Sequence, residues 1–423
     1  MTLRSVVVLA LLAVGCGRSE LDPRPEDAGR TQDGGTPDGG RPDAGMVDGG
    51  RPDAGTADGG RPDAGTADGG DPDGGCPGVW RPTGALPWTT GGTVAAPLPG
   101  GRVLVAGGGD SAQDAAVYDP VTGTFTRTGP MASFRSNFTA TPLSDGRVLV
   151  AGGAGGVPIP PEELYNPATG QFTLTGPLPQ QHVNAAAVRL ADGRVLLAGG
   201  IGIGARPLTE AVIWSPATGR WTLTAPLPAP REKLTLTLLP DGTVLAAGGF
   251  DNAGGPSTGQ STAWRFDPAL DRWTDTGSLL QARAYHSAVL LPSGQVLITG
   301  GISGLGVSAP IAITELYDPR TGTFTETGRL RFGRYAHLTE LLPSGEVLVA
   351  GGWDANGNGP ASEELYSPAT GLWRRVARLL EPRAYPASAV LPGGTVLAVG
   401  GIPIPPRQGF HSSAEVFTPC PSP

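Results

Sequence analysis

The stretch GRVLVAGG (residues 101–108) is an apolar run closed by two glycines, and its pattern recurs along the chain. Upstream of each glycine pair lies another apolar run that ends in a turn such as Pro240-Asp241-Gly242, which is typical of a β-hairpin. The pairs are 45 to 52 residues apart and lie at 107/108, 152/153, 199/200, 248/249, 300/301, 351/352 and 400/401. Self-similarity at this period predicts a repeat architecture.

Each repeat continues with two more short strands. The third ends in an aromatic residue, any residue and Pro, as in ELYDP (315–319), and the fourth follows its turn, as in TGTFTET (321–327). Four strands per unit without helical periodicity are what a β-propeller blade requires. A content of 68 Gly and 44 Pro with 16% charged residues also favours strands and turns. We therefore predict an all-β, seven-bladed propeller.

The glycine pair after an apolar strand, the Tyr before the Pro turn and the Trp or Phe of the last strand resemble Kelch repeats over residues 76–423. In six units an aromatic residue follows the third-strand Pro by five positions, whereas Pro419 has none after it. Trp80, in CPGVWRPTGAL (76–86), matches the missing aromatic. We expect the N-terminal strand to complete the C-terminal blade, which leaves no free sheet edge.

Two of the three cysteines can be placed by this register. Cys420 follows the Pro of the seventh unit by one residue, and Cys76 precedes Trp80 by four, so both occupy one slot of the repeat. We predict a Cys76–Cys420 disulfide that links the two halves of the split blade, with two unpaired thiols as the alternative. A disulfide requires an oxidising compartment.

The N-terminal region predicts export. Residues 1–16 have Arg4, an apolar stretch too short to span a membrane, and the end LAVGC, which resembles the lipobox of bacterial lipoproteins with Cys16 as the lipidated residue. Ordinary signal cleavage is the alternative. Residues 17–75 repeat RPDAG and ADGG units that cannot form a core, so we expect a disordered linker. The expected domains are thus 1–16, 17–75 and a propeller over 76–423.

Charge is concentrated in the linker. Residues 17–75 contain 14 Asp and Glu against 6 Arg, a net charge of −8, which equals the formal charge of the whole chain. The propeller is therefore nearly neutral, and no basic surface for nucleic acid is predicted. The expected partners are an envelope or extracellular protein or glycan, and the membrane through the N-terminal lipid. The expected location is the bacterial envelope or outside the cell, as a monomer.

One position of the repeat, which precedes the first hairpin turn of each unit, suggests a binding site; we call it the arginine slot. We predict that its residues ring the channel mouth: Thr90, Arg135, His182, Arg231, Arg283, Arg334 and Arg383. Aromatic residues accompany them, namely Tyr285, Tyr335, Trp353 and Tyr385. Guanidinium groups beside aromatic faces suit carboxylates and sugars. By resemblance, Kelch adaptors that capture acidic peptides use arginines at similar positions. The alternative is structural: the arginines pair with Glu163, Glu315, Glu364 and Glu415.

Enzymatic alternatives find less support. Copper enzymes that resemble galactose oxidase need a Cys joined to Tyr and two His ligands, and no Cys lies between residues 77 and 419. The Asp354-Ala-Asn-Gly-Asn358 stretch is the first half of a calcium loop without its closing Glu, so a turn explains it better. We expect no metal and no cofactor. The sequence predicts a protein- or glycan-binding module, with a carbohydrate-directed enzyme such as a mutarotase, or an envelope scaffold, as alternatives.

Overall fold

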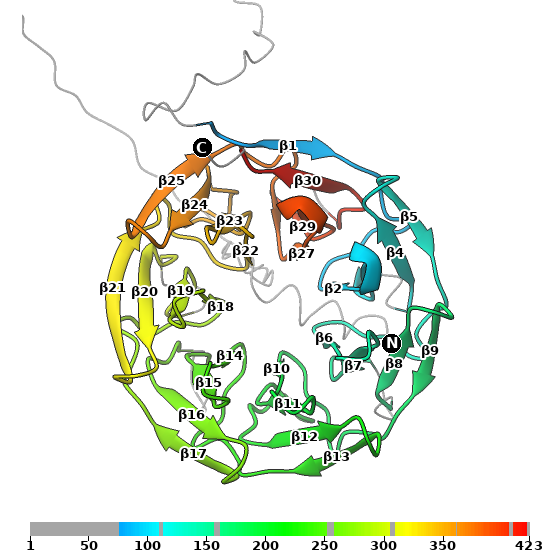
Figure 1. The fold of residues 1–423 in the computed structure, drawn as a ribbon, viewed down its shortest axis with the longest axis vertical. Coiled ribbons are helices and arrows are strands. Elements are labelled where there is room, and N and C mark those ends of the chain that lie inside the picture. The colour runs from blue at the N-terminus through cyan, green and yellow to red at the C-terminus, as the bar shows by residue number, and fades with distance from the viewer. Residues whose placement is uncertain are drawn as a thin grey trace, which may run out of the picture. The chain divides into compact units, whose positions relative to one another are not determined.

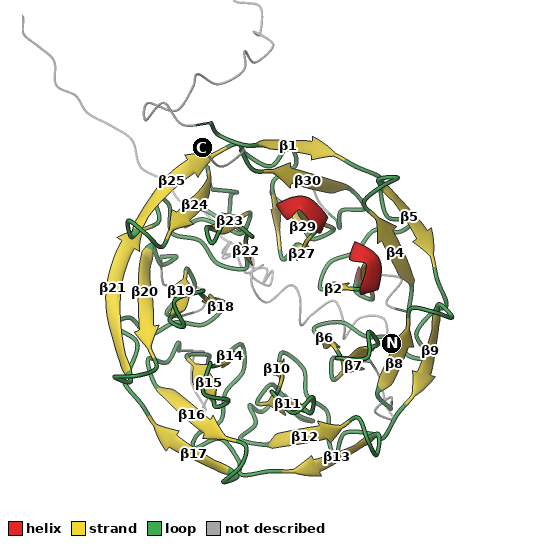
Figure 2. Ribbon diagram, in the orientation of Figure 1, coloured by secondary structure: helices red, strands yellow, loops and turns green. Residues whose placement is uncertain are grey.

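The computed structural model describes residues 76–109, 113–155, 161–251, 258–304, 309–360, 362–405 and 409–420. They form seven four-stranded antiparallel sheets around a central opening (Figures 1 and 2). The predicted seven-bladed all-β propeller is therefore confirmed. Cys16 and the linker over residues 17–75 lie outside the described residues. In the described part of the chain, no helix is long and apolar enough to cross a membrane.

Six blades are built from consecutive strands. From the channel outward they are β2 (Val94–Pro97), β3 (Val103–Ala106), β4 (Ala115–Asp119), β5 (Thr124–Arg127); β6 (Thr139–Pro142), β7 (Val148–Ala151), β8 (Glu163–Asn166), β9 (Gln171–Leu174); β10 (Ala186–Arg189), β11 (Val195–Ala198), β12 (Ala211–Ser215), β13 (Arg220–Leu223); β14 (Thr235–Leu238), β15 (Val244–Ala247), β16 (Ala263–Asp267), β17 (Arg272–Asp275); β18 (Ser287–Leu290), β19 (Val296–Thr299), β20 (Ile313–Asp318), β21 (Thr323–Arg329); and β22 (Leu338–Leu341), β23 (Val347–Ala350), β24 (Glu363–Ser367), β25 (Leu372–Val376).

The seventh blade joins both ends of the described chain. Its strands are β27 (Ala387–Val390), β28 (Val396–Val399), β30 (Ala414–Thr418) and β1 (Val79–Pro82). A two-stranded sheet, β26 (Arg383–Ala384) with β29 (Ile402–Pro403), lies beside it in the chain, and one-turn 3-10 helices form η1 (Pro99–Gly101) and η3 (Pro392–Gly394).

Strand β1 completes this blade as the register predicts. Trp80 pairs with Phe417 across the two strands, and their ring centroids are 5.2 Å apart. Tyr118 and Phe125 make the same pair in the first blade, at 4.8 Å. The Cys76–Cys420 disulfide is present, with its Cα atoms 5.9 Å apart. The N-terminal closure and the disulfide are both confirmed.

The second strand of every blade is the core of the fold. All four residues of β3, of β23 and of their counterparts are buried, because each such strand is covered by the neighbouring blades on both faces. This is why these strands are continuous apolar runs without alternation. The outermost strands are largely exposed and contain polar residues such as Arg and Thr, as in β13.

The glycine pairs fasten each blade to the next. Gly351 has a φ of +67°, and a Cβ atom there would lie 2.5 Å from the carbonyl oxygen of Arg383 in the following blade. The next residue, Gly352, donates its N–H to that same oxygen at 2.9 Å. A left-handed backbone and a close approach both require glycine here, and the contact places the arginine slot directly beside the glycine pair.

Candidate functional site

The predicted arginine ring lies inside the protein wall. All five guanidinium side chains and His182 are buried, with exposed fractions of 0% for Arg283, Arg334 and Arg383, 1% for Arg135 and His182, and 3% for Arg231. The expectation that these groups face a ligand in the channel mouth is therefore corrected. The sequence spacing located the slot correctly but carried no information on which way its side chains turn.

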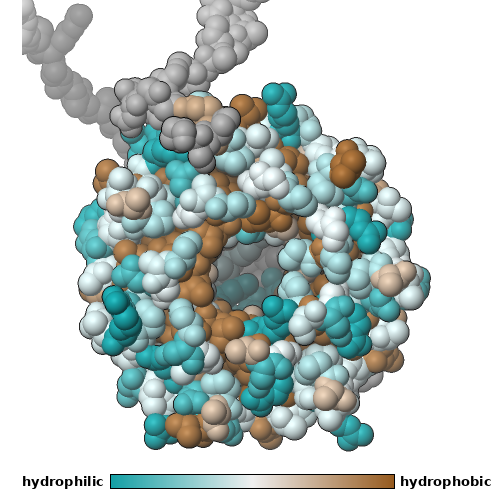
Figure 3. Space-filling model, viewed as in Figure 1, coloured by the Kyte–Doolittle hydropathy of each residue, from teal (hydrophilic) through white to brown (hydrophobic). Residues whose placement is uncertain are grey.

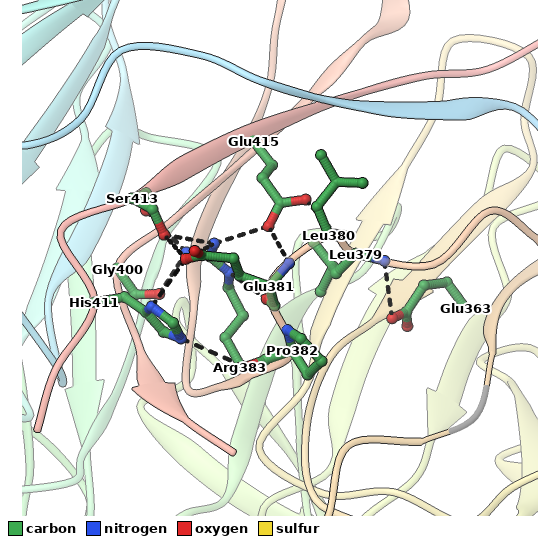
Figure 4. A network of polar contacts seen from close by, with 10 residues as sticks. All are labelled: Glu363, Leu379, Leu380, Glu381, Pro382, Arg383, Gly400, His411, Ser413 and Glu415. Carbon is green, nitrogen blue, oxygen red and sulfur yellow. Dashed lines mark hydrogen bonds and ion pairs between the residues drawn. The ribbon is translucent and has the colours of Figure 1, made fainter. Parts of the chain in front are cut away.

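Arg383 illustrates what these side chains do (Figure 4). Its Nη1 donates to the carbonyl oxygens of Gly400 at 2.9 Å and Ser413 at 2.8 Å, and its Nη2 donates to Glu415 Oε1 at 2.8 Å. The second oxygen of Glu415 accepts the N–H of Leu380 at 2.7 Å. The ion pair thus ties the loop before the first strand to the third strand of the same blade.

Three other blades repeat this arrangement. In each of them the arginine donates to the carbonyl oxygen of the first glycine of the pair, namely Gly152, Gly300 or Gly351. The ion pairs are Arg135–Glu163, Arg283–Glu315 and Arg334–Glu364. Pairing of the arginines with the third-strand glutamates, the structural alternative, is confirmed for four of the five arginines.

The other three blades have different contacts at this position. In the first blade, the Thr90 hydroxyl donates to the Gly107 carbonyl oxygen at 2.8 Å. His182 donates from Nδ1 to the Gly199 carbonyl oxygen at 2.7 Å, and its Nε2 is hydrogen-bonded to Glu210 Oε1 at 3.0 Å. Arg231 lies over the ring of Trp264, 4.8 Å from its centroid, because Trp264 occupies the position of the glutamate in the other blades. Burial lowers the pKa of Arg231. These side chains also belong to the wall.

Two positions after each arginine slot, the chain turns into the channel. The residues there all have a positive φ, from 50° to 74°: Gly92, Asn137, Asn184, Lys233, Tyr285, Ala336 and Tyr385. Backbone hydrogen bonds connect neighbours, for example from the Lys233 N–H to the Asn184 oxygen at 3.1 Å and from the Tyr385 N–H to the Ala336 oxygen at 2.8 Å. We call these seven residues the inner ring. Left-handed Lys and Tyr are uncommon and are concentrated at functional sites.

The inner ring lines a cavity of about 300 Å³. All seven of its residues contribute to the lining, together with Thr93, His286 and His337 among others. Figure 3 shows the central opening of the propeller, with hydrophobic residues gathered on one side of its margin. Sequence reasoning named Tyr285 and Tyr385 but missed Lys233, Asn137 and Asn184. Their constant spacing of two residues from the arginine slot was the signal that could have found them.

An aromatic cluster continues from this cavity. The ring of Tyr285 lies 5.8 Å from that of Tyr385 and 6.2 Å from that of Tyr335, and Trp353 lies 5.3 Å from Tyr385 and 5.5 Å from Tyr335. We call these four residues the aromatic cluster. All four are partly exposed, in contrast to the arginines beside them. The aromatic half of the predicted site is therefore brought together by the structure.

The polar groups of the cavity have perturbed pKa values. Burial lowers the pKa of Lys233 to about 8, against an opposing attraction from Glu232. Burial likewise raises the pKa of Tyr285 to about 12 and that of Tyr385 well above its ordinary value. The pKa of His286 is lowered to about 3 by burial and by Arg283, and that of His337 falls to about 3 in the same way. At neutral pH the tyrosines and histidines are uncharged, and Lys233 carries the positive charge.

A carboxyl group with a perturbed pKa lies on the first, innermost strand of the sixth blade. Glu340 on β22 accepts a 2.7 Å hydrogen bond from the Ser388 hydroxyl of β27 in the next blade. Burial raises the pKa of Glu340 to about 7, with the Ser388 hydrogen bond opposing this rise. The carboxyl is therefore partly neutral under physiological conditions.

Replacing Glu340 by Gln is expected to stabilise the protein at pH 8 but not at pH 4. A carboxyl whose pKa is higher in the folded chain contributes its full stability below the unfolded pKa of about 4.3 and loses it as the pH rises through about 7. We expect a gain of roughly 2 kcal/mol at pH 8, measured by urea unfolding at both pH values. An equal effect of the substitution at pH 4 and pH 8 would contradict this assignment.

Comparisons with known proteins agree with the repeat assignment. A family model described as the Kelch motif matches residues 238–280. The chain is a seven-bladed β-propeller with a Kelch motif in its fourth blade. It is 33% identical over 85 residues to an F-box/kelch-repeat protein of Arabidopsis thaliana, covering 20% of this chain and 17% of that protein. It is 35% identical over 82 residues to galactose oxidase of Gibberella zeae, covering 18% of this chain and 12% of that enzyme.

The similarity to solved structures extends over most of the Kelch propeller. A fungal alcohol oxidase described as an AA5-family enzyme in complex with copper superposes with a TM-score of 0.68. The match covers 81% of this chain and 76% of that chain at 17% sequence identity, which concerns the fold alone. The matches to the two curated relatives span only 17% and 12% of their lengths.

The residues of this Kelch propeller do not fit a copper centre of the kind that the resemblance implies. Cys76 and Cys420 are joined to each other, so neither thiol can be cross-linked to a tyrosine. In the described part of the chain, no three His, Cys, Asp or Glu side chains are grouped to hold a metal ion. Asp354 accepts the N–H groups of Asn356 and Asn358 at 2.8 and 2.9 Å, as expected for a turn.

Proposed function

We propose that this Kelch propeller is an exported recognition module that binds a saccharide at the channel mouth. The observation that carries the proposal is the cavity of about 300 Å³ lined by the inner ring and continued by the aromatic cluster. Cavities of this size hold small ligands, and a few fixed polar groups in them set the orientation. The amides of Asn137 and Asn184 and the hydroxyls of Tyr285 and Tyr385 are such groups.

The aromatic cluster favours a saccharide over other ligands. Flat rings that are partly exposed offer apolar faces, and amide and phenol groups next to them pair with hydroxyls. The arginines take no direct part in this proposal, because each is buried in the wall. Their contribution is to hold the loops that carry the inner ring.

We further propose that the protein is anchored in the envelope through a lipid on Cys16, with residues 17–75 as spacer. The Cys76–Cys420 disulfide supports export, since such bonds persist in oxidising compartments. Membrane fractionation of cells that express the chain with and without Cys16→Ser tests the anchor. Recovery of the wild-type protein entirely in the soluble fraction would contradict it.

Substituting single residues of the aromatic cluster is expected to weaken saccharide binding. We expect Tyr335→Ala and Trp353→Ala each to weaken binding at least tenfold in a glycan array followed by calorimetry on the full chain. Both side chains contact the tyrosines of the cavity without lying in the core. Phe134→Ala is the matched control, because Phe134 is an aromatic residue that is 56% exposed beside Arg135 and is not a member of the cluster.

The outcomes separate the competing functions. Saccharide binding that Trp353→Ala removes and Phe134→Ala preserves would support the proposal. Equal loss in both variants, or binding to proteins but to no saccharide, would overturn it. The second of these results would indicate a protein-binding propeller.

A further inference from the structure

Lys233 is the single lysine of the chain, and it lies in the cavity of the inner ring. Its amine lies 4.9 Å from the ring centroid of Tyr285 and 5.7 Å from that of Tyr385. These tyrosines belong to the loops before β18 and β27, so residues of three blades meet here. A left-handed φ of 54° at Lys233 directs its loop into the channel.

The positive charge of the Lys233 amine is balanced differently from the charges of the buried arginines. Arg135, Arg283, Arg334 and Arg383 each form an ion pair with a buried carboxylate. For Lys233, by contrast, the described residues provide no ion pair. Glu232 attracts it electrostatically, and the carboxylate of Glu232 accepts the side-chain N–H of Asn184 at 3.0 Å. An ammonium group removed from water without a close counter-ion is costly.

The charges and hydrogen-bonding groups of the residues that line the cavity favour a negatively charged ligand. Among the described residues that line it, Lys233 is the one lysine or arginine, and there is no Asp or Glu. The two histidines of the lining are neutral because their pKa values are near 3. The buried Oδ1 atom of Asn184 has no hydrogen-bond donor among the described residues. The cavity therefore offers one positive charge, two phenol hydroxyls and an unused amide oxygen.

We propose that the cavity binds the carboxylate of a hydroxylated acid of monosaccharide size, a sugar acid, with Lys233 as its counter-ion. This inference rests on the proposed saccharide-binding function. The carboxylate supplies the missing negative charge, the hydroxyls of Tyr285 and Tyr385 donate to it, and Asn184 Oδ1 accepts from a sugar hydroxyl. One ammonium group matches the single charge of a carboxylate better than the double charge of a phosphate.

This arrangement predicts that the affinity for the carboxylate depends on pH. Binding requires the ammonium form, and the pKa of the free amine is about 8, so affinity should fall as the pH rises above this value. Tyr285 and Tyr385 remain neutral there because their pKa values are raised. A bound carboxylate should raise the pKa of Lys233.

The test compares glucuronate with glucose, which differ in the carboxylate, on the full chain by calorimetry at pH 7 and pH 9.5. We expect glucuronate to bind at least tenfold more tightly than glucose at pH 7 and to lose most of this preference at pH 9.5. Lys233→Met should remove the preference for glucuronate over glucose. Lys233→Arg should retain it at both pH values. Glucose 6-phosphate is the comparison for a phosphate ligand, and Arg320→Ala, an exposed cation outside the cavity, is the control variant.

A second measurement does not depend on a variant that folds. Because the chain has one lysine, lysine labelled with nitrogen-15 gives one side-chain amine to titrate. We expect glucuronate, but not glucose, to raise its pKa by at least one unit. Equal affinity for both sugars, with loss of both in Trp353→Ala, would overturn the sugar-acid assignment and leave the proposed function intact. Binding of no saccharide at all would overturn both.

Discussion

Removal of the Cys76–Cys420 disulfide is expected to lower the free energy of unfolding by about 5 kcal/mol, an upper value from the loss of loop-closure entropy. The bridge joins residues 344 positions apart, so it restrains almost the whole propeller in the unfolded chain. It also holds strand β1 in the seventh blade, where Trp80 is buried against Phe417. Urea unfolding of the oxidised chain and of the Cys76→Ser, Cys420→Ser double variant measures the difference.

Reductant provides the control for this prediction. It should lower the unfolding midpoint of the wild-type chain and have no effect on the double variant. The single variant Cys16→Ser should behave as the wild type does. A double variant as stable as the oxidised chain would show that the pairing of β1 with β30 closes the ring without covalent help.

Replacing Arg334 by Met is expected to cost about 3 to 5 kcal/mol of stability, because it leaves buried carboxylates without their counter-ion. Arg334 donates to Glu363 at 3.0 Å and to Glu364 at 2.9 Å, and all three side chains are at most 4% exposed. Burial already raises the pKa of Glu363 despite the opposing effect of Arg334. Without the arginine, the pKa of Glu363 should rise further and this carboxyl group should become protonated more readily.

The pH dependence identifies this mechanism. In the variant the folded pKa of Glu363 should rise further above its unfolded value, so the stability deficit should be largest at high pH and shrink as the pH falls through that raised pKa. Adding Glu363→Gln and Glu364→Gln should restore part of the lost stability at neutral pH. Arg320→Met, which removes a side chain that is 86% exposed, should leave the unfolding midpoint unchanged. A deficit that does not vary with pH would indicate lost packing instead.

Much of this fold could be predicted from the sequence because the pattern of one blade occurs seven times along the chain. Three features recur at nearly constant spacing: the apolar second strand, the glycine pair and the paired aromatics. The strand is apolar because both of its faces are buried, the glycines provide a left-handed backbone, and the aromatics contact each other across two strands. The same register placed Trp80 opposite Phe417 and Cys76 beside Cys420. The closed ring and its disulfide could therefore be predicted without coordinates.

The candidate site could be predicted from the sequence only in part. The arginine slot was correctly located, yet a slot does not say whether its side chains face the channel or the wall. That choice depends on Glu415 and its counterparts, about 30 residues further on, whose carboxylates hold the guanidinium groups inside the blade. Trp264 replaces the carboxylate for Arg231, an exchange that spacing alone does not interpret.

Repetition along the chain was sufficient for the blades, because the contacts that define a blade are made between residues close in sequence and recur in every unit. The cavity has no such repeat. Lys233, Tyr285 and Tyr385 come from different blades, and the residue type at that position varies from unit to unit. They meet because closure of the ring brings seven loops to one axis, and burial at that axis then alters the charge that Lys233 can hold.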